Sequence, residues 1–180
     1  MPAMIVLETE RLLFRDHAPG DLELFCVMEA DPEFRRYVGG KPRTRSAAER
    51  RFRDVYLPPV SDRRGLWATV FKPEGLYIGY CGIYTHSGPA GPIPGEGALA
   101  FYLARPYWGR GLATEAGRAF INFGFRELQL LRIVATVQSG NEASNRVLDK
   151  LGFRWVRLDR GEIRSFDEFE LWSPAAQRQA

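Results

Sequence analysis

The sequence is poor in the residues that build disulfide frameworks and metal sites. Only two cysteines, Cys26 and Cys81, occur in 180 residues, which is too few for a disulfide-bonded scaffold. The two histidines, His17 and His86, have no spacing typical of metal ligands. We therefore expect neither structural disulfides nor a metal site.

Long apolar runs and dense basic runs are also missing. The N-terminus lacks the basic segment and apolar stretch of a signal peptide, and no apolar run approaches the roughly 20 residues that a membrane-spanning helix needs. The net charge of +3 comes from dispersed cations, whereas nucleic-acid sites usually gather basic residues on one face. We expect a soluble cytoplasmic protein with neither a nucleic acid nor a membrane as its partner.

What the sequence does contain suits one domain of ordinary size. Hydrophobic residues make up 45% of the chain, enough for a substantial core. Hydrophobic patterning predicts strands over 12–15, 66–71, 76–84, 98–104, 132–137, 154–158 and 168–172. It predicts helices over 22–30, after Thr44 or Ser46, from Leu112 and from Asn141. We expect residues 1–172 to form the domain and residues 173–180 a flexible tail.

Two further segments are defined by their composition. Residues 87–97 are rich in glycine and proline, which predicts an irregular loop between neighbouring strands. The stretch from Arg35 to Arg53 is dense in arginine. It has two interpretations: a solvated helix face with acidic partners, or a site for an acidic or carboxylate-bearing substrate.

A strand, a glycine turn and a helix follow one another between Arg105 and Ala116. Gly109 and Gly111 allow a sharp backbone turn and a close approach by a ligand. The helix that begins near Leu112 presents unpaired N–H groups and a positive dipole end, which favour a phosphate. A plain strand-to-helix turn is the alternative interpretation, because short glycine motifs often occur without a ligand. Neither a P-loop nor a dinucleotide fingerprint fits this segment.

A second pattern, Asn141-x-x-Ser-x-x-x-Leu-x-Lys-x-Gly-Phe153, follows the glycine turn. Together with Tyr107-Trp-Gly-x-Gly-x-Ala-Thr-Glu-Ala116 and an N-terminal Leu7-Glu-Thr-Glu-Arg-Leu-Leu13, it resembles the GNAT superfamily of acyl-CoA N-acyltransferases, specifically the RimJ/RimL-like branch. The resemblance extends to about Leu158. It implies a single α/β domain of the α+β type, in which a mixed, mostly antiparallel sheet contains a splayed pair of parallel strands and carries helices on both faces.

The resemblance also implies an acetyl-CoA site. The N–H groups of the glycine turn would cradle the diphosphate, and strand 98–104 would separate from strand 132–137 to admit the pantetheine. Trp108 stands where many relatives have Gln or Arg. Arg110, Arg146 and Lys150 are candidates for the outer phosphates, against the alternative of ordinary surface charge. The implied cofactor-binding residues are Phe101, Tyr102, Leu103, Trp108, Gly109, Arg110, Gly111, Leu112, Ala113, Thr114, Asn141, Ser144, Asn145 and Arg146.

Such an enzyme moves an acetyl group directly from the thioester to a primary amine, either a protein or peptide N-terminus or a small molecule, through a ternary complex. Ser144 is the expected proton donor to the thiolate, with a water molecule or Tyr102 as alternatives. Ala98 stands where many relatives carry a glutamate, so Glu96 is the candidate for a displaced or relayed base. The missing glutamate leaves a second possibility, a non-catalytic acyl-CoA sensor or protein-interaction module. The final strands and the glycine- and proline-rich segment over 87–97 could mediate a homodimer.

Overall fold

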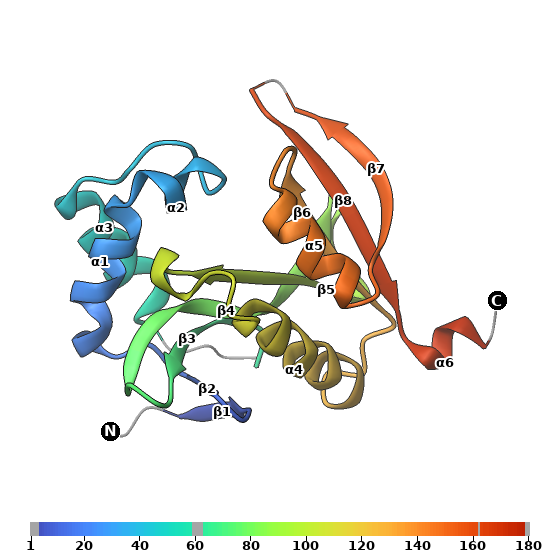
Figure 1. Ribbon diagram of the computed structural model, residues 1–180. Helices are drawn as coiled ribbons and strands as arrows, with labels where there is room; N and C mark the ends of the chain where they lie inside the picture. Colours follow the sequence, from blue (N-terminus) through green and yellow to red (C-terminus); the bar gives the residue numbers. More distant parts are fainter. Residues whose placement is uncertain (1–3, 59–62, 162, 179–180) are drawn as a thin grey trace.

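One mixed sheet runs through the protein (Figure 1). The computed structural model describes residues 4–58, 63–161 and 163–178. In spatial order the eight strands are β1 (Ile5–Glu8), β2 (Leu12–Arg15), β3 (Gly65–Phe71), β4 (Leu76–Gly88), β5 (Gly91–Leu103), β6 (Arg132–Gln138), β8 (Ser165–Trp172) and β7 (Arg154–Arg160). Neighbours pair antiparallel except β5 and β6, which are parallel. The predicted mixed, mostly antiparallel sheet is confirmed.

Helices cover both faces of this sheet, as expected (Figure 1). One face carries α1 (Leu22–Ala30), α2 (Pro32–Arg36) and α3 (Arg45–Arg51), which continues as a π-helical turn over Phe52–Tyr56. The other face carries α4 (Leu112–Arg126) and α5 (Glu142–Lys150). The predicted helix starts are confirmed by their caps: the side chains of Thr44 and Asn141 accept from the N–H groups of Ala47 and Ser144.

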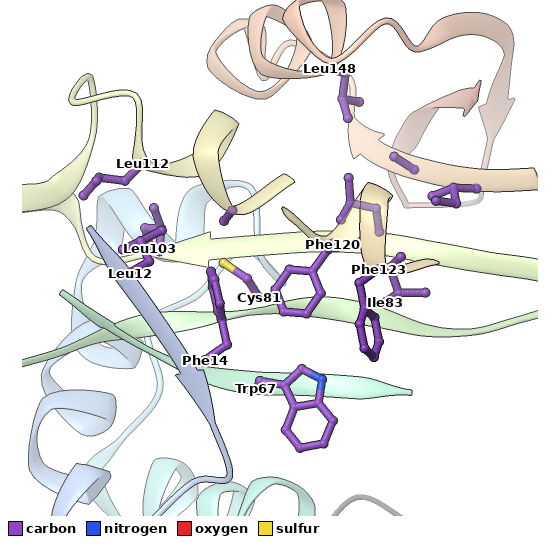
Figure 2. Packing of buried hydrophobic residues seen from close by; sticks show 14 of the residues in the cluster. Leu12, Phe14, Trp67, Cys81, Ile83, Leu103, Leu112, Phe120, Phe123 and Leu148 are labelled. Atoms are coloured by element: carbon purple, nitrogen blue, oxygen red, sulfur yellow. The ribbon is translucent and has the colours of Figure 1, made fainter. Parts of the chain in front are cut away.

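The core is divided into two clusters by the sheet. The larger one packs between the sheet and α4 and includes Phe14, Trp67, Phe120 and Phe123 (Figure 2). The smaller one lies beneath α1–α3 and is rich in aromatic rings. Cys81 is fully buried in the larger cluster, and this burial raises the pKa of its thiol to about 11. It is therefore an inert core residue rather than a nucleophile.

The prediction of an irregular loop over residues 87–97 is wrong. β4 continues to Gly88 and β5 begins at Gly91, so the two strands form one long hairpin with Ser87 paired to Pro92. The prolines are tolerated because β6 pairs with β5 only from Glu96 onward, which leaves this end of β5 as an edge where no N–H is required.

Two elements at the chain ends were not anticipated. β1 adds an edge strand before the predicted strand over 12–15. The segment expected to be a flexible tail begins with a short helix, α6 (Pro174–Gln177), whose cap Ser173 is buried and accepts from the N–H of Ala176. Residues 179–180 of that segment lie outside the described residues.

His17 makes the stability of the fold depend on pH. The ring is buried among the aromatic side chains of the smaller cluster, and its Nε2 lies 3.0 Å from the carbonyl oxygen of Leu66. Burial lowers its pKa to about 4. Between about pH 6.5 and pH 4 the unfolded chain therefore binds a proton that the folded protein does not, so stability falls as the pH falls.

We expect the titration of His17 to lower the free energy of unfolding by about 3 kcal/mol as the pH falls from 7 to 4. Urea unfolding of the wild-type protein and of His17→Gln across this range measures the difference, because the variant lacks the titration. A His17→Gln curve parallel to the wild-type curve would contradict a neutral buried His17.

Candidate active site

β5 and β6 pair over only three residues and then part. The register joins Glu96 to Arg132 and ends with Ala98 opposite Val134. β5 nevertheless stays paired with β4 on its other side as far as Leu103. The stretch from residue 99 to 103 therefore has one edge without a strand partner among the described residues, and the predicted splay of the parallel pair is confirmed.

The main-chain groups of this free edge face the separation. The N–H of Ala104 bonds to the carbonyl of Ile78 on β4 at 2.8 Å. Because successive residues of a strand direct their main-chain groups to opposite sides, those of Leu103 and Phe101 are directed away from β4. The indole Nε1 of Trp108 donates to the Leu103 carbonyl at 2.6 Å. This hydrogen bond fixes Trp108, which begins the glycine loop, against the end of β5. The N–H of Leu103 stays free to donate to a ligand.

The glycine loop has the geometry expected of an anion cradle. Gly109 and Gly111 have φ angles of +71° and +77°, in the left-handed region that favours glycine. A Cβ on Gly109 would meet nothing within 4 Å. The first helical bond of α4 runs from the N–H of Glu115 to the carbonyl of Gly111, so the preceding N–H groups have no helical acceptor. The Leu112 side chain is buried in the core, and only its N–H can serve a ligand.

A carboxylate in the first turn of α4 locks the loop to the N-terminal hairpin. Glu115 accepts hydrogen bonds from the Thr9 hydroxyl at 2.6 Å and from the N–H and Nε of Arg11 at 2.9 and 2.7 Å. Burial raises the pKa of Glu115, but these hydrogen bonds outweigh it and hold the pKa below its usual value. Arg11 also donates to the carbonyl of Arg110. Sequence reasoning missed this clamp, since its partners lie about a hundred residues apart.

The carboxyl ends of β5 and β6 meet at the same edge of the sheet because the strands are parallel, so the segment after β6 lies beside the glycine loop. There the Oδ1 atom of Asn141 is occupied as a helix cap, 3.2 Å from the N–H of Ser144. By contrast, Asn145 Oδ1 and Ser139 Oγ are buried without a hydrogen-bond partner among the described residues. Both oxygens are therefore free to accept a hydrogen bond from a polar ligand. Ser139 was not predicted.

Three cations proposed for the outer phosphates differ in their surroundings. A groove with a volume of about 860 Å³ runs from Gly111 along α4, and Lys150 lines it. Arg110 instead lies over the rings of Phe71 and Tyr107, at 4.6 and 5.2 Å. Arg146 pairs at 3.5 Å with Glu142 on an exposed surface. Arg110 and Arg146 do not line this groove, so Lys150 is the candidate best placed for an outer phosphate. Residues 99–103 of the strand separation do not line it either.

The face of the sheet turned away from α4, here called the α1–α3 face, carries the remaining candidates. A Cβ on Gly97 would point at Ile83 and Leu130, which belong to the cluster beneath α4. Strand alternation therefore places Glu96 and Ala98 on one face, as expected, and this face is the α1–α3 face. Tyr102 lies there too: its ring packs 4.9 Å from that of Tyr80, and burial raises the pKa of its phenol. It is a proton donor rather than a base near neutral pH.

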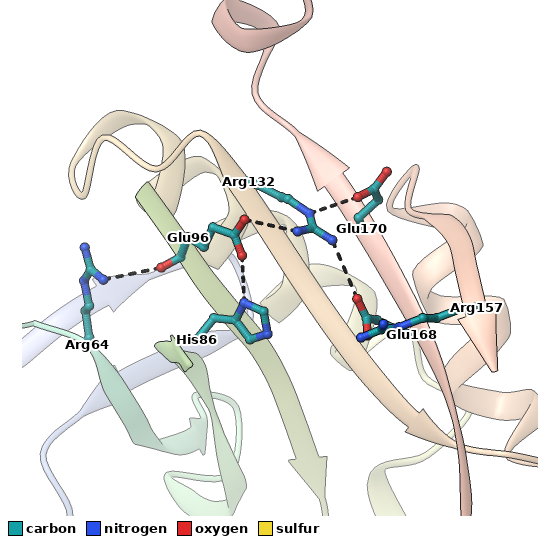
Figure 3. A network of polar contacts seen from close by, with 7 residues as sticks. All are labelled: Arg64, His86, Glu96, Arg132, Arg157, Glu168 and Glu170. Carbon is teal, nitrogen blue, oxygen red and sulfur yellow. Dashed lines mark hydrogen bonds and ion pairs between the residues drawn. The ribbon is translucent and has the colours of Figure 1, made fainter. Parts of the chain in front are cut away.

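Glu96 is not a free carboxylate. One oxygen lies 2.7 Å from Nδ1 of His86, and the other lies 3.1 Å from the guanidinium of Arg132 (Figure 3). Arg132 also contacts Glu168 and Glu170 at 3.6 and 2.9 Å. A carboxylate bonded to one ring nitrogen of histidine orients the ring and leaves the other nitrogen to exchange protons. The structure thus pairs Glu96 with a histidine that sequence reasoning missed, because the hairpin that joins them was expected to be a loop.

The described residues contain neither a membrane-spanning helix nor a cluster of metal ligands. None of the described helices is long and apolar enough to cross a membrane. Within 4–58, 63–161 and 163–178, no three His, Cys, Asp or Glu side chains gather closely enough to hold a metal ion.

Comparisons with known proteins agree with this geometry. The family model of the acetyltransferase (GNAT) domain matches residues 11–154. The chain is 32% identical over 164 residues to the uncharacterized protein YkkB of Bacillus subtilis (strain 168), covering 89% of this chain and 91% of that protein. It is 30% identical over 169 residues to the uncharacterized N-acetyltransferase p20 of Bacillus licheniformis, covering 92% and 89%.

A solved structure shares the fold. The crystal structure of a GNAT-family acetyltransferase from Bacillus anthracis superposes with a TM-score of 0.78 over 94% of this chain and 98% of that one. The two sequences are 22% identical, so this likeness concerns the fold alone.

Proposed function

The chain belongs to the GNAT family of acetyltransferases, and from this premise we propose that it transfers an acetyl group from acetyl-CoA directly to a primary amine within a ternary complex. The observation that carries the proposal is the separation of β5 from β6 beside a left-handed glycine loop. A thioester arm fits between strands only where their hydrogen bonds are absent, and a diphosphate fits at a helix start with free N–H groups.

The residues present fit acetyl-CoA, which would supply the activated acetyl group when bound. The free N–H groups at the start of α4 would hold its diphosphate, and Thr114 would add a hydroxyl. The Leu103 and Phe101 main chain would bond the pantetheine amides and polarise the thioester carbonyl. The unpaired Asn145 and Ser139 side-chain oxygens would meet the same arm.

Proton transfers would be divided between two groups. Ser144, partly buried in the first turn of α5, would donate a proton to the departing thiolate, with Tyr102 as the alternative donor. The amine must lose a proton before it attacks. His86, oriented by Glu96, would accept that proton, so the predicted role of Glu96 as base becomes a relayed one.

The ternary complex predicts a specific kinetic pattern. When acetyl-CoA and an amine are varied together, we expect double-reciprocal plots of the initial rate to intersect, because both substrates must be bound before the acetyl group moves. Parallel lines would indicate an acetylated enzyme intermediate and would contradict direct transfer.

Three expectations about the family branch, the location and the assembly of the protein stay predictions. They are the RimJ/RimL-like branch, the cytoplasmic location and a homodimer through the final strands and the segment over 87–97. Every residue of β7 is exposed at the edge of the sheet, which supports the last of these.

A further inference from the structure

Arg51, at the end of α3, differs from the other arginines of the helical layer. Most of those are paired with carboxylates: Arg35 and Arg43 with Glu29, and Arg45 with Glu23 and Glu49. Arg51 is half-buried, and no described carboxylate pairs with it. Its Nε is enclosed without a hydrogen-bond partner among the described residues. Burial lowers the pKa of the Arg51 guanidinium, but Tyr56, Tyr80 and the charge of Glu29 outweigh this effect and raise it. Arg51 therefore stays charged, and its unpaired Nε can donate to an anionic ligand.

The surroundings of Arg51 connect it to the strand separation through a row of aromatic rings. Its guanidinium lies 5.5 Å from the ring of Tyr56, and Nη2 is 3.4 Å from the Tyr56 hydroxyl. The Tyr56 ring packs 4.7 Å from Tyr80, which packs 4.9 Å from Tyr102 on the separated part of β5. Arg51 is close enough to Tyr102 for its charge to lower the pKa of that phenol against the effect of burial.

Three arginines of this part of the α1–α3 face lie near one buried carboxylate. Glu29 is the buried carboxylate here, and Arg35 and Arg43 already share it. Arg51 adds a third positive charge. The Tyr102 hydroxyl has no described hydrogen-bond partner and can donate to the same anion. The face that borders the thioester position therefore offers a guanidinium fork and a phenol, which together suit a carboxylate.

We propose that the amine substrate carries a carboxylate, and that Arg51 binds this carboxylate while the amine reaches the strand separation beyond Tyr102. The proposal rests on the proposed acetyl transfer and names its substrate class: amino acids or peptides with a free acidic group, rather than polyamines. It also combines the two interpretations of the arginine-dense segment. Arg35, Arg36, Arg43 and Arg45 pair with acidic residues, whereas Arg51 is partly buried and has no such partner.

Matched acceptors test this assignment. Thiol release from acetyl-CoA is measured with the common amino acids and with their C-terminal amides, with peptides that begin with Glu or with Gln, and with spermidine. We expect kcat/KM for acids to exceed that for the matched amides by about 10- to 100-fold, the value of a charged hydrogen bond. Arg51→Gln should abolish this preference by raising KM for the acid, and leave the rate with the amide within about twofold.

Arg50→Gln is the matched control, because it removes an equal charge from an exposed position on the same helix. It should keep the wild-type preference. Calorimetric affinity for acetyl-CoA should be unchanged in both variants, which shows that the fold and cofactor site are intact. Equal turnover of acids and amides, a preference for spermidine, or a preference that survives in Arg51→Gln would overturn the carboxylate assignment alone. Thiol release with no amine at all would overturn the proposed function together with it.

Discussion

Replacing Gly111 by valine is expected to weaken acetyl-CoA binding by about 100-fold or more while the domain stays folded. The backbone there has a φ of +77°, which a β-branched residue avoids. Relaxation of this strain would turn the N–H groups of the helix start away from the diphosphate, and each charged hydrogen bond lost is worth about 1.5–3 kcal/mol. Isothermal titration of acetyl-CoA measures the effect, and Gly111→Ala gives a milder version of it.

Gly152→Val separates this local effect from general strain. Gly152 ends α5 with a φ of +83°, and its nearest foreign atom would lie 3.9 Å from an added Cβ, against 3.6 Å at Gly111. Both substitutions should lower the free energy of unfolding by a similar amount, about 1–3 kcal/mol. Only Gly111→Val should lose affinity. Equal affinities in the two variants would remove the glycine loop from the cofactor site.

Glu29→Gln is expected to destabilise the protein by about 3–5 kcal/mol. Glu29 is fully buried, and one of its oxygens accepts from Arg35 at 3.1 Å and from Arg43 at 2.7 Å, while the other accepts from the Tyr80 hydroxyl. The amide has nearly the same shape but no charge. Arg35, itself buried, would then keep an uncompensated charge. Urea unfolding near pH 7 measures the loss.

The comparison variant is Glu33→Gln, four residues along the chain. Glu33 lies 3.8 Å from Arg36 in an exposed pair, so its removal should change stability by no more than about 0.5 kcal/mol. A small effect at both positions would mean that α1, α2 and the segment after them are held by apolar packing rather than by the buried charge of Glu29.

Local patterns were sufficient for most of the fold. The strands over 66–71 and 132–137 and the helix from Leu112 follow from hydrophobic periodicity, and the Thr44 and Asn141 caps follow from side-chain chemistry within three residues. The hairpin over 87–97 could not be predicted in this way. Whether a proline is tolerated in a strand depends on which strand lies beside it, and that is a property of the folded sheet.

The same distinction separates the predicted from the missed parts of the site. The glycine loop is local, so its left-handed residues were predictable from their spacing. The contact of Glu96 with His86 and Arg132 depends on the register of three strands. The clamp between Glu115 and Arg11 joins residues that lie 104 positions apart in the chain. Neither of these two contacts can be predicted from the sequence pattern near its residues.

The most direct test of the account is whether the protein converts acetyl-CoA. Purified protein is mixed with acetyl-CoA and a broad panel of primary amines, and the free thiol released is counted against the acetylated amine formed. We expect thiol and acetylated amine in equal amounts, at a rate proportional to the enzyme concentration. Saturable acetyl-CoA binding with no thiol release above background for any amine would contradict catalysis and favour a non-catalytic acyl-CoA sensor.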